Sequence, residues 1–132
     1  MTATKYDREM DALHPKQLEQ EMLLMRKNGS PIGLARLRPE RIKGAAQAWI
    51  YLHNPADYDA DDIRRGLRAL LQEAGKQQEF RRLTIPASEE EKGLQGFLEA
   101  VGFKREGTLR EALFYFDEYH DIHLYGASLD SL

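Results

Sequence analysis

The chain has 132 residues, which suits one compact domain, and its 42% apolar and 31% charged residues are typical of a soluble globular protein. A net charge of −3 gives no general attraction to nucleic acid or to an anionic membrane. The absence of cysteine excludes disulfides, thiolate metal sites and cysteine nucleophiles. No apolar run approaches the roughly 20 residues that a membrane helix needs, and the polar N-terminus lacks a signal-peptide core. We therefore expect a cytoplasmic protein with no membrane or nucleic-acid partner.

The first part of the chain predicts a polar segment followed by three strands. Residues 1–20 are polar, and Pro15 favours the start of a short helix because proline suits the first helical position. Asn28-Gly29 separates two apolar runs and predicts a β-hairpin, since both residues tolerate positive φ. Residues 39–44 predict a second turn, and a third strand follows that ends near Pro55.

Two amphipathic helices follow, with a short strand between them. The first spans about residues 59–78, and Asp59 or Asp61 is the expected N-cap. A short buried strand over residues 81–87 comes next. Ser88, with Glu91 three residues later, predicts a capping box at the start of the second helix, which Gly102 ends. The expected buried stripes are, for the first helix, Ile63, Leu67, Leu70, Leu71 and Ala74, and for the second, Leu94, Phe97, Leu98 and Val101.

From Phe103 onward the pattern predicts one further strand leading into a long two-stranded hairpin. The complete order is three strands, a helix, a strand, a helix and the final strands. This order predicts an α/β domain over residues 21–132, with a mixed, mostly antiparallel central sheet flanked by helices.

The C-terminal third carries a series of short motifs in a fixed order. They are Gly102-Phe103, Glu106-Gly107, Leu109-Arg110-Glu111, Tyr119, Asp121 and Tyr125-Gly126. In these motifs the chain resembles the GNAT N-acetyltransferase superfamily, in the branch that includes ribosomal-protein N-terminal acetyltransferases. The family begins with a strand and one or two helices, which need more residues than precede the first predicted strand. The resemblance therefore implies a GNAT-like domain that lacks those elements, which form one wall of the acceptor pocket.

The resemblance also places a cofactor loop. GNAT proteins hold the pyrophosphate of CoA on backbone N–H groups after the fourth strand, with the pattern Gln/Arg-x-x-Gly-x-Gly/Ala. This chain has residues 58–63, YDADDI, at that place. Asp61 and Ile63 replace the small residues, so side chains obstruct the backbone and carboxylates repel a phosphate. The expected degenerate site comprises Asp61, Asp62, Ile63, Arg64 and Arg65.

The arginines after this loop allow two interpretations. Arg64, Arg65 and Arg68 lie just inside the helix, where they are able to reach a phosphate. Alternatively they form an exposed basic face, in which Asp61 and Asp62 have the spacing to pair with Arg65.

Candidate catalytic groups are few. Many family members have a tyrosine on the helix before Gly102 and an asparagine earlier, where this chain has Leu98 and Glu90 or Glu91. Tyr51 and His53 are the remaining candidates for a catalytic base, because they alternate on the strand that borders the acetyl site. Tyr115, Tyr119, His120 and Tyr125 either line an aromatic pocket or pack on the sheet. Asp121 and His123 share a strand face without a third ligand, so no metal site is predicted.

Two functions follow as hypotheses. The first is a degenerate GNAT domain without a cofactor that acts as a binding, regulatory or assembly module. It would associate with itself or another protein, because the missing wall exposes apolar sheet surface. The second is an active acetyl-CoA-dependent N-acetyltransferase for a small amine or a protein N-terminus, with Arg64 and Arg65 replacing the glycine loop. An unrelated ligand in the same cleft, such as an acyl carrier or another nucleotide, is a third interpretation.

Overall fold

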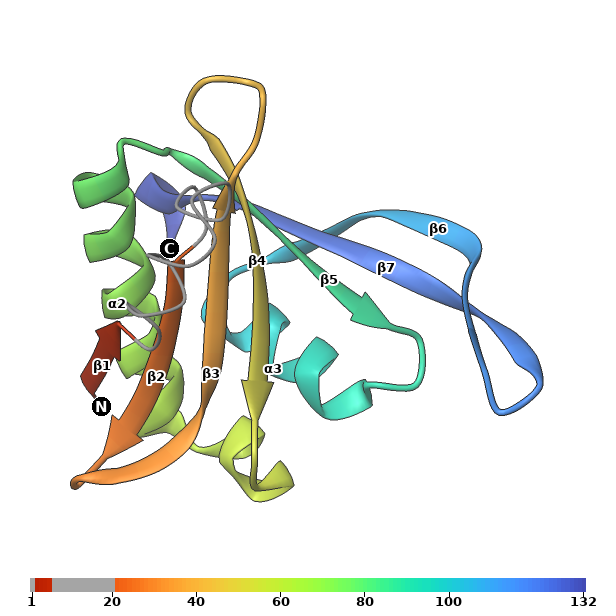
Figure 1. The fold of residues 1–132 in the computed structure, drawn as a ribbon, viewed down its shortest axis with the longest axis horizontal. Helices are drawn as coiled ribbons and strands as arrows, with labels where there is room; N and C mark the ends of the chain where they lie inside the picture. The colour runs from red at the N-terminus through yellow and green to blue at the C-terminus, as the bar shows by residue number, and fades with distance from the viewer. Residues whose placement is uncertain (1, 6–20) are drawn as a thin grey trace, which may run out of the picture.

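A computed structural model describes residues 2–5 and 21–132, which form one seven-stranded sheet in the order β1-β2-β3-β4-β5-β7-β6 (Figure 1). Strands β4 and β5 pair in parallel, and every other neighbouring pair is antiparallel. The predicted α/β class with a mixed, mostly antiparallel sheet is confirmed. The strands are β1 (Thr2–Lys5), β2 (Glu21–Lys27), β3 (Ser30–Pro39), β4 (Ala45–Leu52), β5 (Arg82–Ser88), β6 (Lys104–Tyr115) and β7 (Glu118–Ser128).

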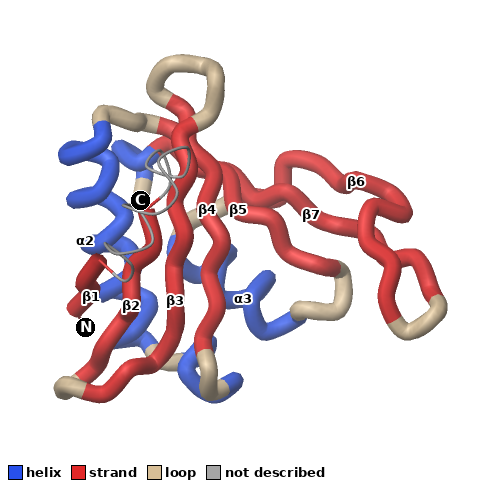
Figure 2. Tube along the Cα trace, in the orientation of Figure 1, coloured by secondary structure: helices blue, strands red, loops and turns tan. Residues whose placement is uncertain are grey.

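Two helices, α2 (Asp61–Gln78) and α3 (Lys92–Val101), cover the same face of the sheet (Figure 2). Two short 3₁₀ helices, η2 (Pro55–Asp59) and η3 (Leu129–Ser131), follow β4 and β7. The predicted helix stripes are buried, except that Leu70 is only partly buried. Neither helix in the described ranges is long and apolar enough to cross a membrane. The largest fully buried side chains are Tyr125, Phe97, Phe103, Met25, Leu37, Ile63, Leu67, Leu71, Leu83, Ile85, Leu98 and Val101.

The two predicted turns between the first strands are confirmed. Asn28 and Gly29 join β2 to β3 with φ values of 52° and 82°, as a tight hairpin of this kind requires. Residues 40–44 join β3 to β4, and Gly44 adopts a φ of 87° there.

Strand β1 corrects the expectation that the first strand of the family is missing. Thr2–Lys5 pairs antiparallel with β2, from Arg26 to Leu23. Four residues are too few to show an alternating pattern, and the pairing depends on the backbone of β2 rather than on local propensity. The short helix predicted from Pro15 lies outside the described residues.

The predicted helix caps are partly wrong. Ala60 is the N-cap of α2 and neither Asp59 nor Asp61 caps it. Ser88 still belongs to β5, so α3 begins only at Lys92, with Glu91 as its N-cap. Half of the capping box forms, because the Ser88 backbone N–H donates to Glu91 Oε1 at 2.9 Å. Gly102 ends α3 with a φ of 127°, as predicted.

The outer part of the β6–β7 hairpin extends well beyond the helices (Figure 1). We call residues 109–122 the arm. The β6–β7 register shifts between Leu109 and Leu113, and Glu111 has a positive φ there. Such a bulge bends a hairpin away from the plane of its sheet.

Candidate functional site

The two parallel strands separate at one end of the sheet. The β4–β5 ladder covers only Ala45–Gln47 and Arg82–Thr84, after which the strands diverge (Figure 1). The His53 backbone N–H donates to the Ile32 carbonyl of β3 at 2.9 Å. The neighbouring Leu52 N–H therefore points to the opposite edge, toward β5, and so does that of Ile50. This edge is where an extended ligand would pair with β4, outside the carboxyl ends of two parallel strands.

Tyr58 fills the far end of this space. Asn54 Oδ1 accepts from the Ala56 N–H at 3.1 Å and starts η2, which carries Tyr58 back toward β4. The Tyr58 hydroxyl accepts a hydrogen bond from the Leu52 N–H at 3.0 Å. Its ring packs edge-on against Phe97 of α3 at 5.6 Å between centroids. Tyr58 thus links the end of β4 to α3 across the separation of the strands.

Burial is the main cause that raises the pKa of Tyr58 above its ordinary value of 10.0. The hydrogen bond from Leu52 opposes this shift, and the nearby Glu91 and Tyr51 add to it. The Tyr58 hydroxyl is therefore neutral at physiological pH, because the hydrogen bond from Leu52 only partly offsets the effect of burial.

The first turn of α2 is occupied by its own carboxylates. Asp62 Oδ1 accepts from the Ile63 N–H at 3.0 Å, and Asp62 also pairs with Lys27 of β2 at 2.5 Å. The hydrogen bond from Lys27 is the main cause that lowers the pKa of Asp62, so this carboxylate stays ionised. A helix N–H that a carboxylate already uses is not free for a phosphate.

Arg64 is likewise held within the loop. Its Nε donates to the Tyr58 carbonyl at 3.0 Å, and its guanidinium lies 3.5 Å from Asp59 and 3.6 Å from Asp61. The Arg64 side chain is only 22% exposed. The pairing predicted between Arg65 and the aspartates is wrong, because Asp61 pairs with Arg64 and Asp62 with Lys27.

The other two arginines behave differently. Arg65 is exposed and forms no ion pair within the described residues. Arg68 donates to the Val101 carbonyl at 3.1 Å, at the C-terminal end of α3, so it is directed away from the loop. Of the three predicted phosphate ligands, only Arg65 is both exposed and free of a carboxylate.

The candidate bases lie at the end of β4. Tyr51 is 58% exposed on the face of the sheet opposite to the helices, and His53 is exposed just after the strand. Neither side chain forms a hydrogen bond or ion pair within the described residues, so no group orients them for proton transfer. Leu98, at the family's tyrosine position, is fully buried in the core.

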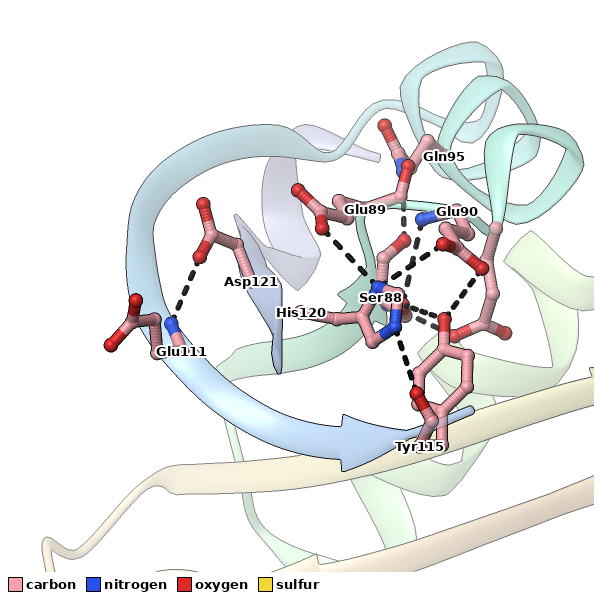
Figure 3. A network of polar contacts seen from close by, with 9 residues as sticks. Ser88, Glu89, Glu90, Gln95, Glu111, Tyr115, His120 and Asp121 are labelled. Atoms are coloured by element: carbon pink, nitrogen blue, oxygen red, sulfur yellow. Dashed lines mark hydrogen bonds and ion pairs between the residues drawn. The ribbon is translucent and has the colours of Figure 1, made fainter. Parts of the chain in front are cut away.

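A polar network that the sequence did not predict joins the arm to the turn before α3 (Figure 3). The Tyr115 hydroxyl donates to Glu90 Oε2 at 2.8 Å and lies 3.3 Å from Ser88 Oγ. His120, only 4% exposed, places Nδ1 3.1 Å from Glu90 and 3.4 Å from Glu89. Its Nε2 lies 3.2 Å from the Tyr115 carbonyl, so both ring nitrogens face acceptor oxygens. Of the two interpretations of Tyr115 and His120, packing describes them better than an aromatic pocket, because their rings stack on each other within a polar clasp.

The pKa of Tyr115 reflects opposing effects in this clasp. The hydrogen bond with Ser88 lowers it, whereas burial, the hydrogen bond to Glu90 and the charges of Glu90 and Glu89 raise it. The net result is a raised pKa. The network fastens the arm, close to its tip, to the turn before α3.

Comparison with known proteins decides the family. The family described as acetyltransferase (GNAT) domain matches residues 1–124. The chain belongs to the GNAT acetyltransferase family. A search of curated proteins finds no match.

Solved GNAT structures share the fold. RimL, the ribosomal L7/L12 alpha-N-protein acetyltransferase in complex with coenzyme A, superposes with a TM-score of 0.75 at 20% identity, covering 93% of this chain and 70% of RimL. Mutant forms of the spermidine/spermine N-acetyltransferase SpeG from Vibrio cholerae superpose with a TM-score of 0.76 at 18% identity. The match covers 92% of this chain and 74% of the SpeG chain. An N-acetyltransferase from Staphylococcus aureus Mu50 superposes with a TM-score of 0.71 at 22% identity. The match covers 93% of this chain and 76% of the other chain.

For a GNAT domain, the loop between β4 and α2 is the expected place of the CoA pyrophosphate. Several donors in and beside this loop already have partners within the chain. The Leu52 N–H is used by Tyr58, the Ile63 N–H by Asp62, and the Arg64 guanidinium by two aspartates. The GNAT fold is thus present with a cofactor loop that is bonded to itself.

Proposed function

We propose that this GNAT-family chain is a non-catalytic binding or regulatory module that does not hold acetyl-CoA in the manner of the family. The observation that carries the proposal is the hydrogen bond from the Leu52 N–H to the Tyr58 hydroxyl. It uses the last backbone donor of β4 that faces β5, and it places an aromatic ring where an extended ligand would leave the sheet.

Charge supports the same conclusion. Asp57, Asp59, Asp61 and Asp62 crowd the start of α2, and Glu91 lies close enough to Tyr58 to raise its pKa. Each carboxylate near a pyrophosphate would cost about 1 kcal/mol when screened at a protein surface. Arg64 offsets part of this charge, but it is already paired. Repulsion by several carboxylates together lowers the affinity for an anionic ligand by about two orders of magnitude or more.

The candidate catalytic residues do not support an active acetyltransferase. Leu98 occupies the core where the family often has its acid, and Tyr51 and His53 have no orienting partner in the described part of the chain. A protein with this arrangement retains the sheet and helices of a transferase while its surfaces serve for binding.

An active acetyl-CoA-dependent N-acetyltransferase is the second candidate. The separation of β4 and β5 favours it, since the Ile50 N–H on the free edge of β4 is a donor for an extended ligand. Arg65 is the exposed cation nearest to the loop in sequence.

A gain-of-binding experiment tests the proposal. Asp61→Gly with Asp62→Gly removes two carboxylates and opens the backbone of the first turn, so acetyl-CoA binding should become measurable by calorimetry. Glu40→Gln with Glu73→Gln is the matched control, because it removes two negative charges at exposed sites away from the loop. Micromolar binding by the unmodified chain, abolished by Arg64→Ala with Arg65→Ala, would establish the second candidate instead.

A further inference from the structure

The face of the sheet opposite to α2 and α3 carries a group of side chains that the candidate site does not use. Burial alternates along β4, where Ala48 and Ile50 belong to the core below the helices and Trp49 and Tyr51 lie on the other side. The register of β2, β3 and β4 places six side chains there in two adjacent rows. The rows are Met22–Arg36–Trp49 and Leu24–Leu34–Tyr51. We call these six residues, together with Arg38, the open face.

The charged groups of the open face are all cations. Arg36 lies directly across from Trp49 in the β3–β4 register, with its guanidinium 4.0 Å from the ring centroid. Arg38 lies 5.2 Å from the same ring and donates to Gln47 Oε1 at 2.8 Å. Both arginines are exposed, and within the described chain neither forms an ion pair with a carboxylate. Two uncompensated positive charges therefore flank an aromatic ring.

The residue types of the open face are those of a protein–protein contact. Aromatic residues, methionine and arginine are enriched at the centre of such contacts, whereas lysine, aspartate and glutamate are depleted. The open face holds a tryptophan, a tyrosine, a methionine and two arginines, with no lysine, aspartate or glutamate. Tyr51 is 58% exposed, so its ring is accessible to a partner. Tryptophan, tyrosine and arginine are also the residues that most often dominate binding energy.

Single-stranded nucleic acid fits this surface less well. Bases stack on accessible aromatic rings, but the Arg36 guanidinium already lies over the Trp49 ring. The net charge of −3 opposes a long polyanion outside the immediate reach of the two arginines. A protein segment with a few carboxylates needs only these local cations.

The dimensions of the open face match those of one α-helix. Three strands at a spacing of about 4.8 Å give a surface roughly 10–15 Å wide, and a helix is about 10 Å in diameter. From Leu34 to Arg38, β3 spans about 13 Å, which corresponds to roughly nine helical residues. A helix with one apolar stripe is a common second layer on such a sheet face.

We propose that the open face binds an amphipathic helix of a partner protein, whose apolar stripe is bordered by carboxylates. The stripe packs on Leu34, Trp49 and Tyr51, and the carboxylates pair with Arg36 and Arg38. This names a partner class for the binding function proposed above and rests on that function. The two proposals can fail separately, because acetyl-CoA titration examines the loop before α2 and the following experiment examines the open face.

A peptide selection tests the proposal without a known partner. A display library of random peptides about 14 residues long, enough for roughly four helical turns, is selected on the unmodified chain. The enriched peptides should carry apolar residues at i, i+3, i+4 and i+7 with Asp or Glu beside them, and should gain helicity on binding. Trp49 is the only tryptophan of the chain. A blue shift of its fluorescence with a tryptophan-free peptide therefore reports that the open face is covered.

Charge reversal locates the contact. Arg36→Glu with Arg38→Glu should weaken binding of the selected peptides about 100-fold or more, because like charges then face each other. Arg36→Gln with Arg38→Gln should give a smaller loss in the same direction. The matched control is Lys76→Glu with Lys92→Glu, an equal reversal at exposed positions of α2 and α3 that should leave the affinity unchanged. Circular dichroism confirms that each variant is folded.

Four outcomes would overturn the proposal. They are a selection without a specific binder, enriched peptides that lack the acidic and apolar helical pattern, unchanged affinity in both Arg36/Arg38 variants, and tighter binding of a single-stranded RNA oligonucleotide than of the selected peptides.

Discussion

The Tyr58 hydroxyl and the Leu52 backbone N–H are joined by a hydrogen bond of 3.0 Å across the end of β4. The bond is possible because η2 turns the chain back toward the strand directly after Pro55. Tyr58 thereby connects β4, the loop before α2 and, through Phe97, the helix α3. Hydrogen bonds from within the chain thus hold the loop against β4.

Replacing Tyr58 with Phe should lower the free energy of unfolding by about 1 kcal/mol, because the Leu52 N–H loses its acceptor while the ring packing is kept. Chemical denaturation at neutral pH measures this. Tyr119→Phe is the matched control, since the Tyr119 hydroxyl makes no hydrogen bond within the described residues. Equal stability of the two variants would show that the bond contributes nothing.

The raised pKa of Tyr58 predicts loss of stability at high pH. The pKa of Tyr58 is higher in the folded state than in the unfolded state. The contribution of neutral Tyr58 to the free energy of unfolding is therefore complete below the unfolded-state pKa and is lost as the pH rises through the folded-state pKa. Between about pH 9 and about pH 11 the unmodified chain should therefore lose more stability than Tyr58→Phe. Urea unfolding at both pH values gives the comparison, and parallel losses would argue against a raised pKa.

The pKa of Asp62 should be lower with Lys27 present than without it, because the hydrogen bond from Lys27 is the largest cause that lowers this pKa. Its depressed pKa implies stability that is present above the unfolded value and is lost as the pH falls through the folded value. Lys27→Met removes the hydrogen bond, so the carboxyl carbon of Asp62 should titrate at a higher pH by NMR. Lys76→Met, a similar change at the other end of α2, should leave that titration in place.

Gly33 should not tolerate a side chain. A Cβ at Gly33 would collide with the Tyr51 carbonyl oxygen in the adjacent strand, so Gly33→Ala should destabilise the fold by about 1–3 kcal/mol. Gly96, on the exposed side of α3, has no atom near an added Cβ. Gly96→Ala should therefore stabilise the chain by up to about 1 kcal/mol. Thermal unfolding of the two variants checks the opposite signs, and shifts in the same direction would contradict this packing.

Sequence reasoning succeeded where the determinants are local. The Asn28-Gly29 hairpin and the Gly102 helix stop depend on positive φ at those residues, and the helix stripes depend on periodicity. Strand β1 was missed because Thr2–Lys5 has no signal of its own and is defined by its pairing with β2.

The candidate site was harder to predict, because its contacts join distant residues. The sequence alone predicts that the loop at residues 58–63 is unsuited to phosphate, but the bond of Tyr58 to Leu52 depends on the η2 turn. His120 meets Glu89 and Glu90 from a separate hairpin, and no spacing in the sequence relates them. Contacts between residues that lie far apart in the sequence can be identified only once the fold is known.

The most direct test of the central claim is calorimetric titration of the unmodified chain with acetyl-CoA at moderate salt. We predict no saturable heat up to millimolar acetyl-CoA, since the backbone donors and Arg64 are already engaged within the loop. Saturable binding in the micromolar range would contradict the account and identify the chain as a cofactor-binding acetyltransferase.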